Sequence, residues 1–512
     1  MLVLSVMNID DLIAYAKRRG LFWNSSEIYG GISGAYDYGH IGTLIKRNFE
    51  KAWLDFFLNL SDNFYQIDPA VMMPEKVLVS SGHKAHFNDL VVICEKCKTP
   101  YRADVLLSDV GIEINEGAVS EEVDTTINEK KIRCPKCNGK LSNAKPFNLM
   151  FDLKLGPSGE EIGYLRPETA QGAYLNFYRE FNILRKELPL GLAIIGKAYR
   201  NEIAPRQGLY RLRELLQAEL QIFFDPQNPN EVINKSISGE IWESRKINVV
   251  YANNESKIIT IKDFIDSGIP SFYAFYLSMV DIFYREVLKY PLEKLRYHEK
   301  GEKDRAFYNK IHFDIELNIE SFNGFREVGG IHYRTDYDLT NHSKGSMQDL
   351  SVPFMDKKFI PHVLELSFGV DRNIWALIDI FFNKEGDRNV LHLPEYIAPM
   401  LAGIFPLQKD LAIKAYEIYN SLRRRFALFY DQSGSIGKRY ARADEIGIPY
   451  CITIDYDTLN KESPNFDTVT IRERDTKNQE RIKITELEYF LMKHSIYKIE
   501  GNFYDGSMGR KI

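Results

Sequence analysis

The chain has 512 residues, of which 44% are hydrophobic, and its 66 Lys and Arg stand against 71 Asp and Glu, for a formal net charge of -5. This length predicts two to four domains, and the sequence lacks the run of about 18 apolar residues that spans a membrane. Five cysteines are too few for a disulfide framework and the start has no basic region, so we expect a cytoplasmic protein without a signal peptide.

The N-terminal part alternates helical and glycine-rich sequence. Residues 10–19 predict a short helix that Asp10 can cap and that Gly20 can end in a left-handed conformation. A glycine-rich stretch follows at 30–42. Residues 43–57 then carry apolar side chains at helical spacing, which indicates an amphipathic helix.

Four of the five cysteines form two C-x2-C pairs, Cys94 with Cys97 and Cys134 with Cys137. Each pair offers two thiolates from a tight turn, and two pairs complete a tetrahedral site, so the pattern predicts structural Zn²⁺. The alternative is four unrelated buried cysteines. We expect residues 88–145 to form a zinc-ribbon insertion whose polar linker folds out as a hairpin.

The remaining chain divides by composition. Residues 226–305 are rich in Asn and Lys and carry no recognisable chemical motif, so we predict that they form a second, variable insertion. Pro394 and Pro399 mark a boundary, after which strands and helices alternate. The predicted domains are 1–393, containing both insertions, and a small α/β domain at 394–512.

The segment IIGKAYRNEIAPRQGLYRLRELLQAELQIFF at 194–224 predicts a hairpin with several arginines around its turn: Arg200, Arg206, Arg211 and Arg213. Guanidinium groups bind phosphate oxygens in fork geometry, so such a hairpin suits a polyphosphate. The alternative is an exposed charged hairpin, in which Glu202 and Glu214 serve as salt-bridge partners. The residues of this hairpin alone do not distinguish a polyphosphate-binding site from an exposed charged surface.

Further segments resemble, in order, the motifs of the class II aminoacyl-tRNA synthetases, and together they resemble homodimeric glycyl-tRNA synthetases. They are SSEIYGGISGAYDYG at 25–39, SGH at 81–83, YRAD at 101–104, LRPETAQG at 165–172, RNEIAPRQGLYRLRE at 200–214, QAE at 217–219, VLELSFGVDR at 363–372 and SGSIGKRYARADEIGIPYCIT at 433–453. The resemblance covers most of the chain except 226–305. It implies an α/β (α+β) fold, with a class II catalytic domain whose antiparallel sheet is flanked by helices, and a C-terminal α/β anticodon-binding domain.

The resemblance also implies where ATP binds. Arg200 resembles the arginine that holds the α-phosphate, Arg372 the arginine on the γ-phosphate, and Glu202 falls where the adenine amino group is contacted; these three are the predicted catalytic residues. The other positions predicted to bind ATP are Asn201, Tyr210, Arg211, Leu212, Arg213, Glu214, Leu215, Glu327, Val328, Gly369, Val370 and Asp371. Glu327 and Glu365 match carboxylates near the Mg²⁺ that accompanies ATP.

The predicted glycine pocket is acidic. By resemblance it comprises Arg102, Glu168, Leu215, Gln217, Glu219, Glu365, Ser367 and Gly369. Acidic side chains hold the ammonium group of glycine and crowd its Cα, so that larger amino acids are excluded by size. For Glu168 the alternative is a salt bridge with Arg166.

The implied reaction has two steps, in which glycine and ATP form glycyl-adenylate and pyrophosphate, and the glycyl group then passes to the 3′-terminal adenosine of tRNA(Gly). The implied cofactors are ATP, Mg²⁺ and structural Zn²⁺, and the implied partners are glycine, tRNA(Gly) and a second copy of the chain. Candidate contacts to RNA phosphates in the C-terminal domain are Lys438, Arg439, Arg442 and Arg472, for which the alternative is a solvated charged face.

The sequence departs from the family pattern at three positions. His40 and Leu366 stand where the family usually has proline, and Leu215 stands where it often has phenylalanine. Two other classes of protein stay open: a non-catalytic binding protein with this fold, and a class II synthetase for proline, threonine or serine. The retained Arg200 and Arg372 count against the first class, and the RPETAQG segment against the second.

Overall fold

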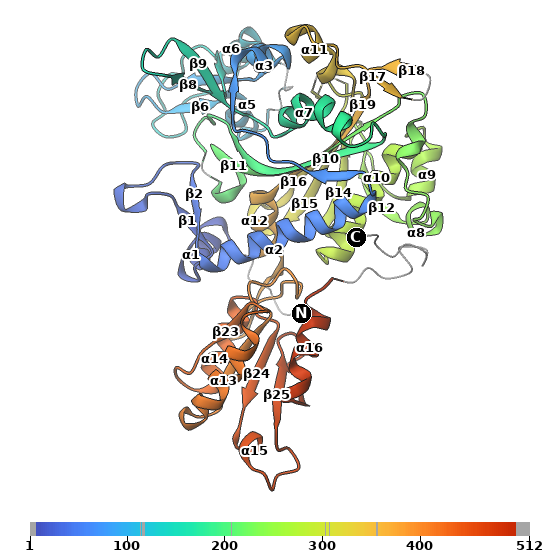
Figure 1. Ribbon diagram of the computed structural model, residues 1–512. Helices are drawn as coiled ribbons and strands as arrows, with labels where there is room; N and C mark the ends of the chain where they lie inside the picture. Colours follow the sequence, from blue (N-terminus) through green and yellow to red (C-terminus); the bar gives the residue numbers. More distant parts are fainter. Residues whose placement is uncertain are drawn as a thin grey trace.

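The computed structural model describes residues 7–497 apart from 113, 115–117, 206, 303, 307 and 355–356. Its centre is a nine-stranded sheet in the order β13-β12-β14-β15-β16-β19-β11-β10-β3 (Figure 1). The strands are β13 Ser256–Thr260, β12 Lys246–Val250, β14 Leu295–Glu299, β15 Ile311–Ile319, β16 Gly324–Thr335, β19 His362–Gly369, β11 Glu214–Phe224, β10 Leu190–Tyr199 and β3 Phe64–Gln66. Neighbours from β14 to β10 pair antiparallel, whereas the β10–β3 and β12–β14 pairs are parallel.

The alternation of side chains along β11 gives this sheet two different faces. Leu216, Ala218, Leu220 and Ile222 join the main hydrophobic core. The intervening residues point to the opposite face, because successive side chains of a strand alternate. Helices α2 (His40–Phe57) and α12 (Val370–Phe381) lie on the core side, and α7 (Ala170–Ile183) lies on the other, as Figure 1 shows.

The segment 226–305 is integrated into the large sheet and the main core. It supplies β12, β13 and β14, together with α8 (Gly239–Glu243), α9 (Ile261–Asp266) and α10 (Ser271–Ile282). Every residue of α10 after Ser271 is buried, and most of them belong to the main core. Whether this segment varies within the family stays a prediction, but its side chains are part of one continuous packed interior.

The four cysteines lie in a small module built on β5 (Asn88–Ile93), β6 (Pro100–Arg102) and β7 (Lys145–Asn148). The described part of the linker forms two helices, α5 (Ala103–Ser108) and α6 (Ser120–Glu129), so the expected hairpin was wrong. Apolar residues of both helices, such as Leu107 and Val123, pack beside Cys94 and Cys134. Their burial favours helices that cover the small sheet over an extended hairpin.

Several shorter elements complete the part of the molecule that contains the large sheet. Beside the small module are α3 (Glu75–Ser80), α4 (His83–His86) and the sheet of β4 (Met72–Pro74), β8 (Phe151–Leu155) and β9 (Glu161–Leu165). Others are α1 (Ile9–Arg18), β1 (Phe22–Asn24), β2 (Tyr36–Tyr38), α11 (Tyr337–Ser346), β17 (Val352–Phe354), β18 (Lys357–Phe359), β20 (Phe382–Glu385) and β21 (Arg388–Leu391). Asn8 caps α1 in place of the expected Asp10, because the helix begins one residue earlier.

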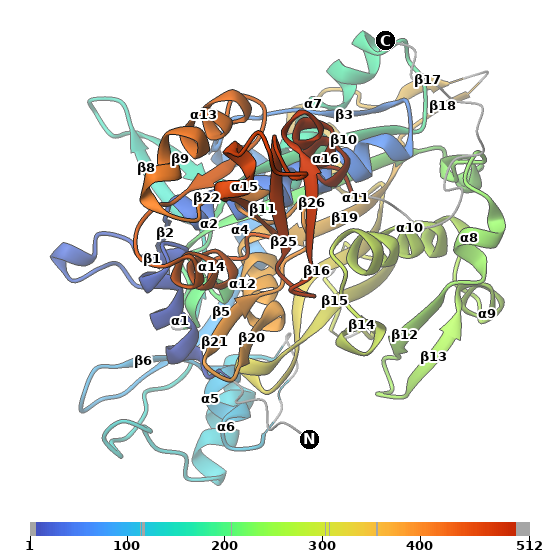
Figure 2. The same ribbon diagram turned by 90° about the horizontal axis from the view of Figure 1, so that it is seen from below.

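The C-terminal part has its own five-stranded sheet, in the order β23-β22-β24-β25-β26, and its own core. Its elements are β22 (Ala402–Pro406), α13 (Ala412–Leu422), β23 (Leu428–Tyr430), α14 (Ile436–Glu445), β24 (Tyr450–Ile454), α15 (Tyr456–Leu459), β25 (Thr468–Glu473), β26 (Gln479–Lys483) and α16 (Leu487–His494). Figure 1 shows it as a separate body below the large sheet, and Figure 2 views the molecule from the side of this body. The alternating strands and helices predicted here are therefore present.

The end of α14 connects the two parts. Asp444 accepts from Arg388 of β21 and from Arg472 of β25, at 2.8 and 3.0 Å, and all three side chains are at most 16% exposed. The hydroxyl of Tyr15 on α1 donates to the backbone carbonyl of Glu445. Removing one member of such a buried pair leaves its partner's charge uncompensated, so this junction holds the two parts in a defined arrangement. Among the described residues, no helix is both long and apolar enough to cross a bilayer.

Candidate active site

One face of the large sheet carries a group of polar side chains from three strands, called here the polar bed. Its members are Gln217, Glu219 and Gln221 of β11, Arg334 of β16, and Glu365 and Ser367 of β19. The register pairs Gln217 of β11 with Gly369 of β19, Glu219 with Ser367, and Gln221 with Glu365. Alternation therefore turns Gln217, Glu219 and Gln221 to one side. Thr169 donates to Gln217 and to Glu219, and Tyr174 donates to Gln221, so these side chains lie against the segment 169–174.

Glu219 lies at the centre of this bed and is 3% exposed. The hydroxyls of Thr169 and Ser367 donate to its two carboxylate oxygens, at 2.6 and 2.9 Å. Burial, together with the carboxylates of Glu365 and Glu168, raises the pKa of Glu219 to about 8. The side chain of Glu219 is therefore neutral at pH 7, and an incoming cation favours the loss of its proton.

Glu168 faces the same space from the loop before α7. His83 and Arg334 approach its carboxylate at 3.4 and 3.7 Å, and the amide of Gln171 donates to it at 2.8 Å. Burial by itself would raise its pKa, but His83 and Arg334 hold the pKa of Glu168 well below its usual range. Glu168 is thus an ionised, oriented carboxylate. The alternative pairing with Arg166 is not found, because the guanidinium of Arg166 donates to the carbonyls of Lys197 and Pro69.

Arg334 contacts several of the buried carboxylates of the site, and the sequence did not predict this role. It is 1% exposed and donates to Asp338 at 2.9 Å and to Glu365 at 3.1 Å. Its guanidinium carbon lies 3.9 Å from the ring centroid of Tyr308. The amide of Gln221 also donates to Glu365, at 2.7 Å. Glu365 therefore accepts from both Gln221 and Arg334, and it orients the guanidinium that approaches Glu168.

A second group of charges gathers where α12 begins. Arg372 forms an ion pair with Glu327 at 2.8 Å, and its guanidinium carbon lies 4.9 Å from the ring centroid of Tyr210. Burial opposes its charge, but Glu327 and Tyr210 raise the pKa of Arg372. This permanently charged guanidinium faces the turn of the β10–β11 hairpin, where an anion can be bound.

Arg200 and Glu202 occupy the other side of that turn. Arg200 donates to the carbonyl of Pro167 at 3.1 Å and is half-buried, so most of its fork stays available. Arg211 approaches Glu202 at 3.4 Å. Arg213 donates instead to the carbonyl oxygens of Glu202 and Ser33, and it thereby fixes the turn. Arg206 lies outside the described residues.

Arg102 belongs to the Glu202 side. It pairs with Asp89 at 3.2 Å and with Asp104 at 2.7 Å. Burial opposes its charge, yet Asp89, Asp104 and Glu202 raise the pKa of Arg102. The structure thus groups Arg102 with the nucleotide positions, and its assignment to a glycine pocket stays a prediction.

The other predicted nucleotide positions differ in their exposure. Leu215 is half-buried on the site face, and Glu214 is exposed and pairs with Lys197 at 2.7 Å. The backbone N–H of Asn201 donates to Leu149 at 2.6 Å. The side chains of Leu212, Val328, Val370 and Asp371 are buried, and the carboxylate of Asp371 accepts from Tyr38 and from the backbone of Leu216. Asp371 therefore anchors α12 to β11 from the core side.

Glu327 and Glu365 are separated along the sheet. The register pairs Glu365 with His332, which lies five residues after Glu327 on β16. A rise of about 3.3 Å per residue places the backbones of the two residues about 16 Å apart along the strand, which is too far for both side chains to bind one ion. Glu327, which is half-exposed beside Arg372, is the carboxylate that suits a polyphosphate-bound cation.

The four predicted cysteine ligands meet. Their sulfur atoms all lie within 4.8 Å of one another, and the Cys94–Cys137 and Cys97–Cys134 separations are 3.5 and 3.6 Å. A tetrahedral zinc ion with Zn–S bonds of about 2.3 Å places its sulfurs about 3.8 Å apart, which this cluster matches. Both knuckles turn in the same way, since Lys98 and Asn138, each directly after a pair, have φ of 56° and 58°. The fifth cysteine, Cys451, is fully buried and lies outside this cluster.

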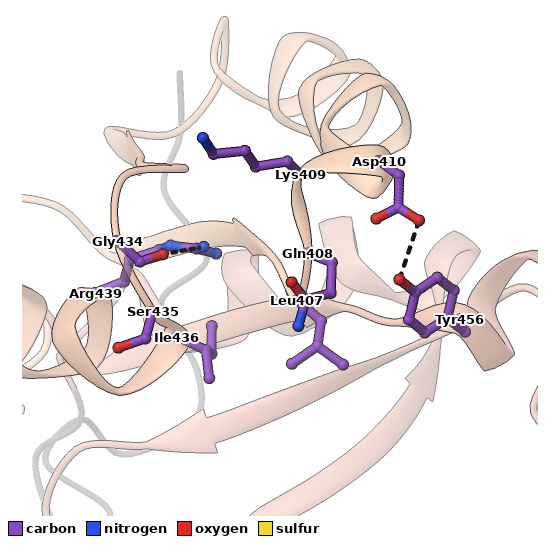
Figure 3. Close-up of a pocket in the computed structure, with 9 residues that line it drawn as sticks. All are labelled: Leu407, Gln408, Lys409, Asp410, Gly434, Ser435, Ile436, Arg439 and Tyr456. Atoms are coloured by element: carbon purple, nitrogen blue, oxygen red, sulfur yellow. Dashed lines mark hydrogen bonds between the residues drawn. The ribbon is translucent and has the colours of Figure 1, made fainter.

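The C-terminal part holds a pocket of about 470 Å³ at the start of α14 (Figure 3). Arg439 lines it but is only 2% exposed and donates to Gly434, while the hydroxyl of Tyr456 donates to Asp410. Arg472 is also buried, and Arg442 pairs with Asp431. The expectation that Arg439 and Arg472 face RNA phosphates was wrong, because both lie on inward faces; Lys438 alone of the four is exposed.

Several site residues were missed because their partners are distant in the sequence. Arg334, Thr169, Tyr174, Asp338 and His83 contact the predicted carboxylates or each other. The available signals were the SGH segment, which contains His83, the LRPETAQG segment, which contains Thr169, and the spacing of Arg334 and Asp338 four residues apart. None of these signals identifies Glu168 or Glu365 as a partner.

Comparison with known proteins agrees with this geometry. Residues 154–381 match the family model described as the tRNA synthetase class II core domain (G, H, P, S and T), and residues 402–494 match the anticodon binding domain. The fold aligns with a solved structure of the RNA binding domain of threonyl-tRNA synthetase from Cryptosporidium parvum Iowa II, at a TM-score of 0.58 and 16% identity over 94% of this chain and 98% of that chain. Fold and site therefore define a class II tRNA synthetase, as predicted.

The particular family follows from closer relatives. Glycine–tRNA ligase of Thermococcus sibiricus is 35% identical across 95% of this chain and 98% of its own length. The corresponding ligases of Pyrococcus furiosus and Methanothermobacter thermautotrophicus are 36% and 33% identical across 92% and 94% of this chain, and across 96% and 98% of their own lengths. The chain belongs to the glycine–tRNA ligase family.

Proposed function

We propose that this protein is an ATP-dependent glycine–tRNA ligase. The observation that carries the proposal is one β-hairpin with two kinds of group: arginines at its turn and Glu219 on its returning strand. In the first step the carboxylate of glycine attacks the α-phosphate of ATP, and pyrophosphate leaves. Arg200 binds the α-phosphate and Arg372 the γ-phosphate, so that charge on the phosphoryl oxygens is stabilised as it develops.

Glu168 and Glu219 are proposed to hold the ammonium group of glycine. Glu168 is ionised and is oriented by His83 and Arg334, which supports this role. Ser367 pairs with Glu219 in the register and closes the floor of the pocket. Because every competing amino acid is larger than glycine, a pocket that leaves no space beside the Cα selects glycine by size.

The second step transfers the glycyl group to the 3′-terminal adenosine of tRNA(Gly). The C-terminal part, which matches an anticodon binding domain, is proposed to bind the distant arm of the tRNA. Mg²⁺ bound with ATP would neutralise part of the phosphate charge, and Glu327 would hold it. Zinc at the four cysteines is proposed to be structural. A homodimer is proposed from resemblance alone, and sedimentation velocity showing only a 59.4 kDa particle would reject it.

ATP–pyrophosphate exchange with each amino acid tests the assignment. We expect exchange with glycine alone, and we expect Arg200→Ala to lower it at least about a hundredfold, because a positioned donor to the phosphoryl group is lost. Exchange with proline, threonine or serine would identify a different synthetase. Absence of exchange with every amino acid would identify a binding protein, and near-normal exchange by Arg200→Ala would reject the role of that arginine.

A further inference from the structure

Phe87 lies between the two halves of the proposed active site, and neither sequence motif nor family role drew attention to it. It follows α4 directly and precedes β5 of the cysteine module. Its ring centroid lies 5.4 Å from the guanidinium carbon of Arg200. A cation placed over an aromatic face at this range is attracted to it, so the ring gives the guanidinium a preferred position.

The same ring also contacts the amino-acid side. It meets His83 edge-on, with ring centroids 5.6 Å apart and an interplanar angle of 63°. His83 in turn approaches Glu168 at 3.4 Å, and its other ring nitrogen is 2.8 Å from the hydroxyl of Ser81. One aromatic ring thus borders the arginine proposed for the α-phosphate and the histidine that orients the carboxylate proposed for the ammonium.

The backbone strengthens this connection. The carbonyl of Phe87 accepts from the N–H of Leu149 at 3.1 Å, and the carbonyl of Leu149 accepts from the N–H of Asn201 at 2.6 Å. Two hydrogen bonds therefore join Phe87 to the residue that follows Arg200. Beneath the ring, a small cluster of Leu78, Met150 and Tyr164 supports it. A buried support of this kind keeps an aromatic ring in one orientation.

We propose that Phe87 is a positioning residue, which holds Arg200 and His83 in register so that the α-phosphate and the ammonium group of glycine are presented to each other. This inference rests on the proposed function, in which Arg200 binds the α-phosphate. Catalysis of this type depends on alignment within fractions of an ångström, because the reacting groups must meet in a near-attack geometry. A loosened Arg200 therefore lowers the rate even though no charged group is removed.

Glycine-dependent ATP–pyrophosphate exchange by Phe87→Leu, Phe87→Tyr and Phe147→Leu tests the proposal. Phe147 is a half-buried aromatic on β7 of the same small sheet and serves as the matched control. We expect Phe87→Leu to lower kcat/KM for ATP about tenfold and to raise the KM for glycine, since a partly desolvated cation–π contact corresponds to about that factor. Phe87→Tyr keeps a ring and is expected to stay within about twofold of the wild-type protein, as is Phe147→Leu.

Melting temperature and bound metal, measured on each variant, separate positioning from a general loss of structure. The proposal is overturned if Phe87→Leu is as active as the wild-type protein, if Phe87→Tyr is impaired equally, or if activity falls only in proportion to melting temperature. Arg200→Ala distinguishes the two levels of inference. If Arg200→Ala is inactive and Phe87→Leu is as active as the wild-type protein, only the positioning role of Phe87 is rejected. If Arg200→Ala is active, the proposed role of Arg200 is rejected as well.

Discussion

At the scale of single residues, two carboxyl groups of the site, those of Glu168 and Glu219, differ in their protonation state. Glu168 is surrounded by His83 and Arg334, whereas Glu219 is held by the hydroxyls of Thr169 and Ser367. Burial and neighbouring carboxylates raise the pKa of Glu219 to about 8, while His83 and Arg334 keep the pKa of Glu168 well below its usual range. The pocket can therefore hold a proton before a ligand arrives and release it afterwards.

This arrangement predicts that glycine binding releases a proton at pH 7. In the free protein Glu219 is protonated below pH 8, whereas the ammonium group of glycine favours the carboxylate, so binding expels the proton and apparent affinity rises as the pH approaches 8. Titration calorimetry in two buffers of different ionisation enthalpy measures the release. We expect about one proton for the wild-type protein and none for Glu219→Gln. Binding without proton release at pH 7 would contradict the prediction.

At the scale of elements, the cysteine module depends on distant chain segments meeting. The knuckles around Cys94 and Cys134 are held together by a small sheet and by α5 and α6, whose apolar residues pack beside the cysteines. A structural zinc ion contributes folding free energy directly, because the ligand set is assembled only in the folded state. Loss of one thiolate is therefore expected to affect the module far more than the large sheet.

Cys134→Ser is expected to abolish stoichiometric zinc binding and to expose residues 94–137 to proteolysis. Elemental analysis of the purified protein measures the first effect and limited digestion the second. The matched control is Cys451→Ser, which alters a buried thiol outside the cluster and should keep one zinc per chain. Retention of a full equivalent of zinc by Cys134→Ser would show that the four thiolates do not act as one site.

At the scale of the whole molecule, amino-acid activation and RNA binding are assigned to different bodies. The β10–β11 hairpin lies in the large sheet, whereas α14 and its pocket lie in the C-terminal part (Figures 1 and 3). The buried Arg388–Asp444–Arg472 junction joins them. The two activities should accordingly respond to different substitutions.

Lys438→Glu is expected to raise the KM for tRNA several-fold and to leave glycine-dependent exchange unchanged. Lys438 is the exposed cation on the first turn of α14, and reversal of its charge repels RNA phosphates. Aminoacylation kinetics at two salt concentrations measure the effect, which should shrink at the higher concentration. Lys51→Glu, at an exposed position on α2, is the control. An equal effect of both substitutions would indicate non-specific electrostatics.

The sequence by itself determined the local patterns of the site. Residues 194–224 predicted a hairpin with arginines around its turn, and the structure contains this hairpin as β10 and β11. The C-x2-C pairs predicted a four-sulfur cluster, and the ordered motifs predicted the class, the family and the reaction, which the comparisons confirm. The individual ATP and glycine contacts, and the domain boundaries, stay predictions.

Only the tertiary structure decided which groups meet across long separations. Arg334 contacts Glu168, which is 166 residues earlier, and Phe87 contacts Arg200. It also decided that 226–305 completes the large sheet and that Arg439 and Arg472 turn inward. A hydrophobic period or a turn motif reports on neighbours along the chain, whereas ion pairs and ring contacts depend on sheet order and register. The hairpin could therefore be predicted from its own residues. The contacts of Arg334 with Glu168 and of Phe87 with Arg200 could not.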